Sequence, residues 1–289
     1  MSNTIELAKS FVPKLDECYR LASLTSVLDG APELAKQGAN ANELIIPMMG
    51  MDGLADYSRN GGYVQGGVTM TNETVKCNFD RGRRFDVDVM DDLETAGLAF
   101  GRLSAQFIRD KVVPELDAFR FASYCGISGV TKKEETLADG AATVAALSAA
   151  VTAMDDEEVT ATGRYLFITP TLLQGINDMD TTKSKKVLEG FERVIKVPQR
   201  RFYTAIKQLS GKTGEEAGGY TKAAGAANIN FAIVQKDALI QYTKHAAPKI
   251  IAPENNPDAD AYVFGYRMVG IAKAYKNMLS GMYFSHDKA

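Results

Sequence analysis

The sequence predicts an α+β fold in which one α/β domain is inserted between the two halves of another domain. Three observations indicate this class. Apolar residues recur at helical spacing from about residue 93 to residue 124, helix and strand patterns alternate over residues 127–245, and strand patterns return over residues 249–268. The first pattern corresponds to a helix of about 50 Å, which exceeds the depth of a small domain. We therefore expect this helix to be a spine that joins the two halves.

Two segments precede the spine. Residues 1–42 have scattered apolar positions and are expected to form a partly helical arm, which must lie either on its own subunit or on a neighbour. Residues 43–79 are expected to form a long hairpin, because strand patterns flank residues 50–67, which contain six glycines. A connection of this length is typical of a functional loop, although a plain surface loop explains it too.

A half-buried strand is predicted for residues 84–90, where apolar and acidic side chains alternate. Asp91 and Glu94 then have the spacing of a capping box at the start of the spine helix. Pro114 lacks the N–H that would bond to the carbonyl of Asp110, so we expect a bend there. The apolar stripe of the helix comprises Leu93, Ala96, Phe100, Leu103, Phe107, Val112, Leu116 and Phe119.

The region 127–245 reads as helices and strands in alternation. An amphipathic helix ends at Asp155 and Asp156, and a second helix begins at Pro170 with Thr169 as its cap. A loop of small residues is expected from Gly211 to Ala227. Strands are expected at residues 164–169, 194–198 and 229–235.

Composition excludes several classes of protein. The 289 residues carry a net charge of −3, which argues against binding to nucleic acid by bulk electrostatics. The longest uncharged run, residues 140–154, is shorter than the ~20 apolar residues of a membrane span, and charges at the N-terminus argue against a signal peptide. Three cysteines form neither a disulfide framework nor a zinc pattern. We therefore expect a protein made in a reducing cytoplasm, without a membrane anchor.

No catalytic, cofactor-binding or metal-binding residues are predicted, and no cofactor is expected. His245 and His286 are the only histidines, and both are expected in surface loops. Gly211-Lys212-Thr213 ends like a phosphate loop but has Ile206 where that motif needs glycine. An enzyme or small-ligand-binding protein remains an alternative, supported only by a cluster of four acidic residues. Strand alternation and helix capping explain these residues too, which are Asp86, Asp88, Asp91 and Asp92.

The order of these segments resembles the major capsid proteins of tailed bacteriophages, which have the Hong Kong 97-like fold. The resemblance covers nearly the whole chain but includes no catalytic signature. The strings that carry it are Asn40-Ala41-Asn42-Glu43 with Ile45-Ile46-Pro47, Asp52-Gly53-Leu54 to Tyr57-Ser58-Arg59, Asp80-Arg81-Gly82-Arg83, and Phe107-Ile108-Arg109 with Val113-Pro114-Glu115-Leu116-Asp117-Ala118-Phe119-Arg120-Phe121.

The resemblance implies a division into four parts. Residues 1–42 would be the N-terminal arm, and residues 43–79 the extended loop (E-loop) that overlaps a neighbouring subunit. Residues 80–126 and 246–289 would form the peripheral domain with the spine helix, and residues 127–245 the axial domain around capsomer centres. Some relatives crosslink a loop lysine to a neighbour's asparagine, but this sequence has no lysine from Gly38 through Val75, which argues against that chemistry here.

The implied function is structural and not enzymatic. Copies of the chain would assemble into pentamers and hexamers of an icosahedral virion shell, in the host cytoplasm, around double-stranded DNA that is enclosed without sequence-specific binding. Separate scaffolding and portal proteins would be partners, with decoration proteins as a further candidate. The nearest alternative with the same fold is the shell of an encapsulin-type cargo nanocompartment.

Overall fold

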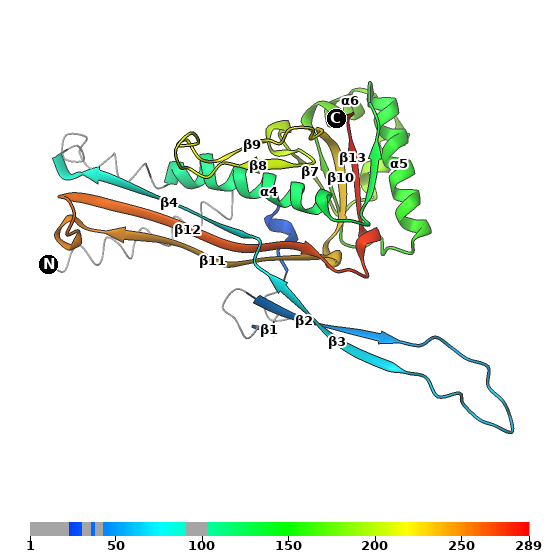
Figure 1. Ribbon diagram of the computed structural model, residues 1–289. Coiled ribbons are helices and arrows are strands. Elements are labelled where there is room, and N and C mark those ends of the chain that lie inside the picture. Colours follow the sequence, from blue (N-terminus) through cyan, green and yellow to red (C-terminus); the bar gives the residue numbers. More distant parts are fainter. Residues whose placement is uncertain (1–22, 31–35, 38–42, 91–102, 104, 289) are drawn as a thin grey trace.

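The computed structural model describes residues 23–30, 36–37, 43–90, 103 and 105–288. Two sheets form the body, a long helix runs along one sheet and ends against the other, and a hairpin protrudes from the body (Figure 1). The α+β class predicted from the sequence is confirmed.

A five-stranded sheet has the order β5-β13-β10-β6-β7. Its central strand β10 is antiparallel to both neighbours, whereas the two edge strands pair in parallel. The strands are β5 (Thr131–Glu134), β6 (Arg164–Ile168), β7 (Arg193–Lys196), β10 (Ile229–Gln235) and β13 (Met282–His286). The helices that accompany this sheet are α5 (Gly140–Asp156), α6 (Pro170–Asp178) and α7 (Thr182–Glu189).

Both faces of this sheet are covered, which explains the uninterrupted apolar run in β10. Phe231 and Ile233 pack in a core with residues of α5 and α6, while Ala232 and Val234 pack on the opposite face with Phe121 of the spine helix. A strand buried on both faces cannot show the alternation of a half-exposed strand.

A three-stranded antiparallel sheet has the order β11-β12-β4. The apolar side of β4 and β12 faces the helix, where Phe79, Phe264 and Met268 pack against Val113 and Leu116. This sheet is therefore the support on which the spine helix lies. Its strands are β4 (Phe79–Asp88), β11 (Leu239–Ile251) and β12 (Ala261–Ala274).

The spine helix is described from residue 105 onward, and the predicted Asp91–Glu94 capping box lies outside the described residues. A π-helical segment (Ile108–Val112) precedes α4 (Val113–Gly126), with the Val113 N–H bonded to the Ile108 carbonyl. A π-helical turn is wider than an α-helical turn and occurs where the regular i to i−4 hydrogen bonds of an α-helix are interrupted. The irregularity lies directly before Pro114, where the sequence predicted a bend.

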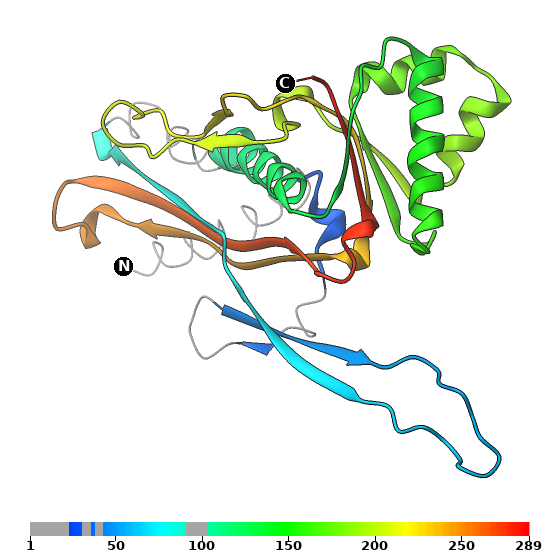
Figure 2. The ribbon, with the colours of Figure 1, turned by 45° about the vertical axis from the view of Figure 1, so that its right-hand side comes forward.

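The predicted hairpin is present as β2 (Glu43–Met51) and β3 (Val68–Lys76), with the short β1 (Lys36–Gln37) beside β2. Its base is attached to the β11–β12 sheet through Val75, which packs with Ile240 and Ile271. Asn78, just after β3, accepts from and donates to the backbone of Ala272 at 3.0 and 2.9 Å. The rest of the hairpin extends away from the body in both views (Figures 1 and 2).

Some positions differ from the sequence-based expectations. β13, expected with the spine helix, pairs in the five-stranded sheet, and β11 begins inside the region assigned to the inserted domain. Residues 220–222, expected in a loop, form β9 (Tyr220–Lys222), which pairs with β8 (Ile206–Gln208). His245 and His286 lie in β11 and β13, not in loops. Local periodicity identifies a strand but not the sheet that it joins.

Candidate assembly surfaces

The outer half of the hairpin exposes large apolar side chains that the rest of the described chain does not cover. Leu54 is fully exposed and Tyr63 is 90% exposed. Exposed apolar surface of this extent is typical of a surface that binds a partner. The other members are Met49, Met51, Tyr57, Val64, Val68 and Met70. We call residues 49–70 the hairpin tip.

The hairpin tip has its own local structure. Ser58 and Gly62 exchange two backbone hydrogen bonds of 3.2 and 2.7 Å, which close a small turn. The rings of Tyr57 and Tyr63 meet edge to face across this turn, with centroids 4.9 Å apart. The Asp52 carboxylate accepts from the Gly67 N–H at 2.7 Å at the point where the strands separate. The tip therefore presents its aromatic side chains in a defined arrangement.

Gly62 is the glycine of the tip that the turn requires, because its φ is +74°. Gly62→Ala should destabilise the turn by about 1 kcal/mol, the cost of a left-handed conformation for an L-residue. The added Cβ has open space, so no clash contributes. Amide exchange at Gly62 should then accelerate about fivefold. Gly53→Ala, which also has open space but no positive φ, is the control, and equal effects of both substitutions would contradict this assignment.

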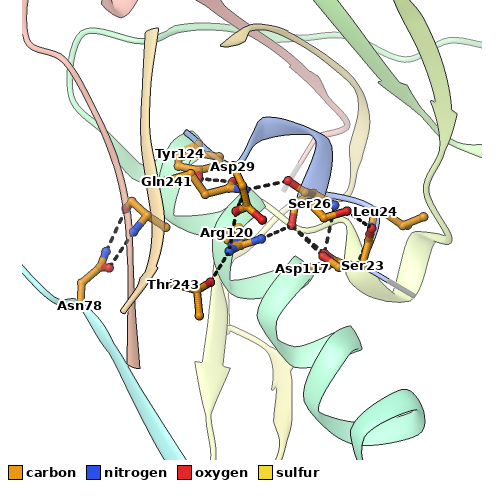
Figure 3. A network of polar contacts seen from close by, with 12 residues as sticks. Ser23, Leu24, Ser26, Asp29, Asn78, Asp117, Arg120, Tyr124, Gln241 and Thr243 are labelled. Carbon is orange, nitrogen blue, oxygen red and sulfur yellow. Dashed lines mark hydrogen bonds and ion pairs between the residues drawn. The ribbon is translucent and has the colours of Figure 1, made fainter. Parts of the chain in front are cut away.

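A buried polar network fixes residues 23–29 to the spine helix (Figure 3). Asp117, which is 0% exposed, accepts from the hydroxyls of Ser23 and Thr25 at 2.9 and 2.7 Å. It also accepts from the backbone N–H groups of Leu24 and Thr25 and from the Arg201 guanidinium at 3.2 Å. Five donors therefore surround this buried carboxylate and compensate for its removal from water.

Arg120 and Gln241 extend the network to β11. Arg120 donates to the Thr25 hydroxyl at 2.8 Å and to Asp29 at 3.2 Å. Gln241 donates to the Thr25 carbonyl and to Asp29, both at 2.7 Å, and accepts from the Tyr124 hydroxyl at 2.6 Å. Burial raises the pKa of Tyr124, so its hydroxyl keeps the proton that it donates. Residues 23–29 are therefore fixed to both the spine helix and β11.

A glycine-rich loop between β8 and β9, residues 209–219, lies against β4 through two arginines. Arg81 donates to the carbonyls of Leu209 and Gly219 at 2.7 and 3.3 Å and pairs with Glu115 at 2.8 Å. Arg83 donates to the Glu216 carbonyl at 2.8 Å. We call residues 209–219 the strap, because it connects the chain leading to β10 with the three-stranded sheet.

Glu215 holds the strap closed from within, so acid should loosen the strap. Its carboxylate pairs with Lys207 at 2.6 Å and accepts from the Ser210 N–H at 2.7 Å, and these contacts lower its pKa to about 2 from 4.5. A lowered folded-state pKa means that the stabilisation is present above pH 4.5 and is lost as the pH falls through about 2.

We expect amide exchange in the strap, corrected for intrinsic rates, to accelerate between pH 4.5 and 2. Glu215→Gln should accelerate amide exchange in the strap already at neutral pH. It should also reduce the further acceleration that acid causes, because Glu215 no longer contributes to it. Glu216, whose pKa is lowered by the Gly214 N–H, remains in that variant. An unchanged acid response in Glu215→Gln would contradict this role.

The two described members of the acidic cluster, Asp86 and Asp88, each have a structural partner. Asp86 pairs with Arg84 at 2.8 Å, and Asp88 accepts from the Met90 N–H at 2.9 Å. Asp91 and Asp92 lie outside the described residues. Within the described part of the chain, no group of three His, Cys, Asp or Glu residues could hold a metal ion, and no helix is long and apolar enough to cross a membrane.

Solved structures with a similar fold come from viral and virus-like shells. The capsid of cyanophage P-SCSP1u matches with a TM-score of 0.55 at 12% identity, covering 87% of this chain and 85% of that chain. The mature capsid of bacteriophage PhiM1 matches with a TM-score of 0.53 at 8% identity, covering 86% and 82%. The chain has a Hong Kong 97-like capsid fold.

A virus-like particle from Pyrococcus furiosus also matches, with a TM-score of 0.61 at 10% identity, covering 97% of this chain and 99% of that chain. No model of a protein family matches the sequence, and no curated protein matches it either. The likeness is therefore one of fold, shared by phage capsids and by this particle.

Proposed function

We propose that this chain is the major capsid protein of a tailed bacteriophage and that it acts without catalysis. The observation that carries the proposal is the hairpin tip, whose apolar side chains are exposed in the single chain. Burying each of them would contribute about 1.5–3 kcal/mol. A second copy can bury them, and rings of copies repeat such a contact in closed shells.

The capsid fold supports a role for each part of the chain. The five-stranded sheet with α5, α6 and α7 would be the axial domain, which surrounds the centres of pentamers and hexamers. The three-stranded sheet and spine helix would be the peripheral domain, and residues 43–79 the extended loop. Scaffolding and portal proteins would be separate partners, and the shell would enclose double-stranded DNA in the virion after assembly in the host cytoplasm.

Negative-stain electron microscopy and light scattering of the purified chain test the proposal. We expect closed shells, or rings of five and six subunits. A chain that stays monomeric or dimeric at high concentration, also when expressed with the scaffolding protein of its own genome, would overturn the proposal.

A cargo nanocompartment is the second candidate, supported by the match to the Pyrococcus furiosus particle over nearly the whole of both chains. The contents of shells purified from the native source distinguish the two. Nuclease-protected double-stranded DNA supports a phage capsid, whereas a co-purifying protein cargo without DNA supports the nanocompartment.

A further inference from the structure

One face of the protruding hairpin carries a stripe of methionines (Figure 2). Met49 on β2 lies directly opposite Met70 on β3, and Met51 lies opposite Val68, two residues further along each strand. Residues two apart on a strand share a face, and directly opposed residues have Cβ atoms about 4.5–5.5 Å apart. The three thioethers therefore form one continuous patch, and we call Met49, Met51 and Met70 the methionine stripe.

The methionine stripe is open to solvent in the single chain. Its three side chains are 61%, 70% and 68% exposed, in the order of the sequence. Three methionines of the body are at most 2% exposed, and these are Met154, Met268 and Met282. An oxidant in solution therefore reaches the stripe far more readily than it reaches these three.

Methionine differs from leucine and valine because its sulfur can be oxidised. The thioether sulfur attacks one oxygen of a hydroperoxide, and an S–O bond forms as the O–O bond breaks. The sulfur loses two electrons, the peroxide gains them, and water or an alcohol leaves after proton transfer. The product is methionine sulfoxide, whose oxygen accepts hydrogen bonds. Oxidation therefore makes an apolar stripe polar.

The sulfoxide affects the free chain and an assembled shell differently. In the free chain the added oxygen faces water, so the folded chain is not destabilised. In a contact between copies the stripe is removed from water, and an added oxygen without a hydrogen-bond donor is costly there. Oxidation therefore favours the free chain over the shell, and enzymes that reduce methionine sulfoxide reverse this effect.

We propose that the methionine stripe is a modification site at which a hydroperoxide reversibly blocks assembly. This inference rests on the proposed shell function and adds chemical regulation to its assembly surface. A free subunit accepts the modification, whereas a subunit in a shell is protected because its stripe is covered. The stripe thus makes assembly sensitive to oxidants and leaves finished shells resistant to them.

Treatment of the unassembled chain with hydrogen peroxide tests this inference. The dose is one at which peptide mass spectrometry finds sulfoxide at the stripe but not at Met154 or Met282. After removal of the peroxide, the concentration at which shells form should be at least about tenfold higher. Methionine sulfoxide reductases for both epimers, with a thiol reductant, should restore it to within about twofold. The free energy of unfolding should not change, because the stripe is exposed.

Leucine substitution separates the stripe from other oxidisable groups. Met49→Leu/Met51→Leu/Met70→Leu keeps the stripe apolar without its sulfur, so this variant should assemble like the unmodified chain and should not respond to peroxide. Met90→Leu/Met278→Leu removes two methionines that are 63% and 42% exposed outside the hairpin, and this matched control should stay sensitive. Both variants keep all cysteines, so oxidation of thiols affects them equally.

Protection in shells gives a second readout that does not depend on yield. Sulfoxide should form severalfold more slowly at the stripe in assembled shells than in the free chain. Three results would each overturn this inference alone: an oxidised stripe that assembles at the unmodified concentration, a leucine variant that stays sensitive, or equal rates of oxidation in shells and free chain. An untreated chain that never assembles would overturn the proposed function and this inference with it.

Discussion

Asp117→Ala should lower the free energy of unfolding by about 3–5 kcal/mol, the range found when one partner of a buried ionic network is removed. The substitution leaves the buried hydroxyls of Ser23 and Thr25 without their acceptor and leaves Arg201 without its carboxylate. Urea denaturation of the unassembled chain measures the loss. A substantial part of the lost free energy should come from detachment of residues 23–29 from the spine helix, and faster amide exchange in these residues would detect it.

A matched control separates this effect from general loss of charge. Asp86→Ala removes an exposed carboxylate that pairs with Arg84, and it should change stability by less than about 1 kcal/mol. Thr25→Ala combined with Asp117→Ala should lose less than the sum of the two single variants, because both remove the same 2.7 Å hydrogen bond. A loss below 1 kcal/mol for Asp117→Ala would show that the network does not hold the segment.

The polar network around Asp117 shows where part of the N-terminal arm lies, which the sequence left open. The arm was expected to lie on its own subunit or on a neighbour, and residues 23–29 lie on their own chain. Leu28 is 1% exposed and packs in the same core as Phe121 and Tyr124. The first 22 residues lie outside the described part of the structure.

Local patterns predicted the elements of the inserted region well. β10 occupies residues 229–235 as expected, and α6 begins at Pro170 as expected, although Thr169 at the N-cap position makes no side-chain capping hydrogen bond. These segments are specified by neighbours in sequence: an apolar run for a strand covered on both faces, and a fixed proline φ for a first helical turn. Such signals need no knowledge of the rest of the fold.

Long-range contacts were not predictable in the same way. Asp117 and Arg120 stood in the apolar stretch of the spine helix, and that misplaced charge was a usable signal for a buried network. Their partners Thr25 and Thr243 lie 92 to 123 residues away along the chain, so the sequence did not identify them. The hydrogen bonds from Arg81 and Arg83 to carbonyls of the strap were equally unpredictable. Every residue has a backbone carbonyl, so the sequence does not show which one accepts.

Replacing Met51, Leu54 and Tyr63 together with serine should prevent shell formation at concentrations at which the unmodified chain assembles, while leaving the chain folded. These side chains are 70%, 108% and 90% exposed, so the folded monomer loses little packing beyond the contact between the Tyr57 and Tyr63 rings. Each contributes about 1.5–3 kcal/mol only when a second molecule buries it. The concentration at which shells form should therefore rise more than about 100-fold, since every 1.4 kcal/mol is a factor of ten.

The two readouts of this variant separate assembly from folding. The free energy of unfolding of the unassembled chain, measured in urea, should fall by no more than about 1.5 kcal/mol, the upper value for one lost aromatic pair. Met278→Ser, at an exposed methionine outside the hairpin, should assemble normally and controls for loss of any exposed apolar group. Shells from the triple variant at the unmodified concentration would mean that the tip is an ordinary surface loop. The burial argument for assembly would then fail, because no other group of exposed apolar residues of this size occurs in the described chain.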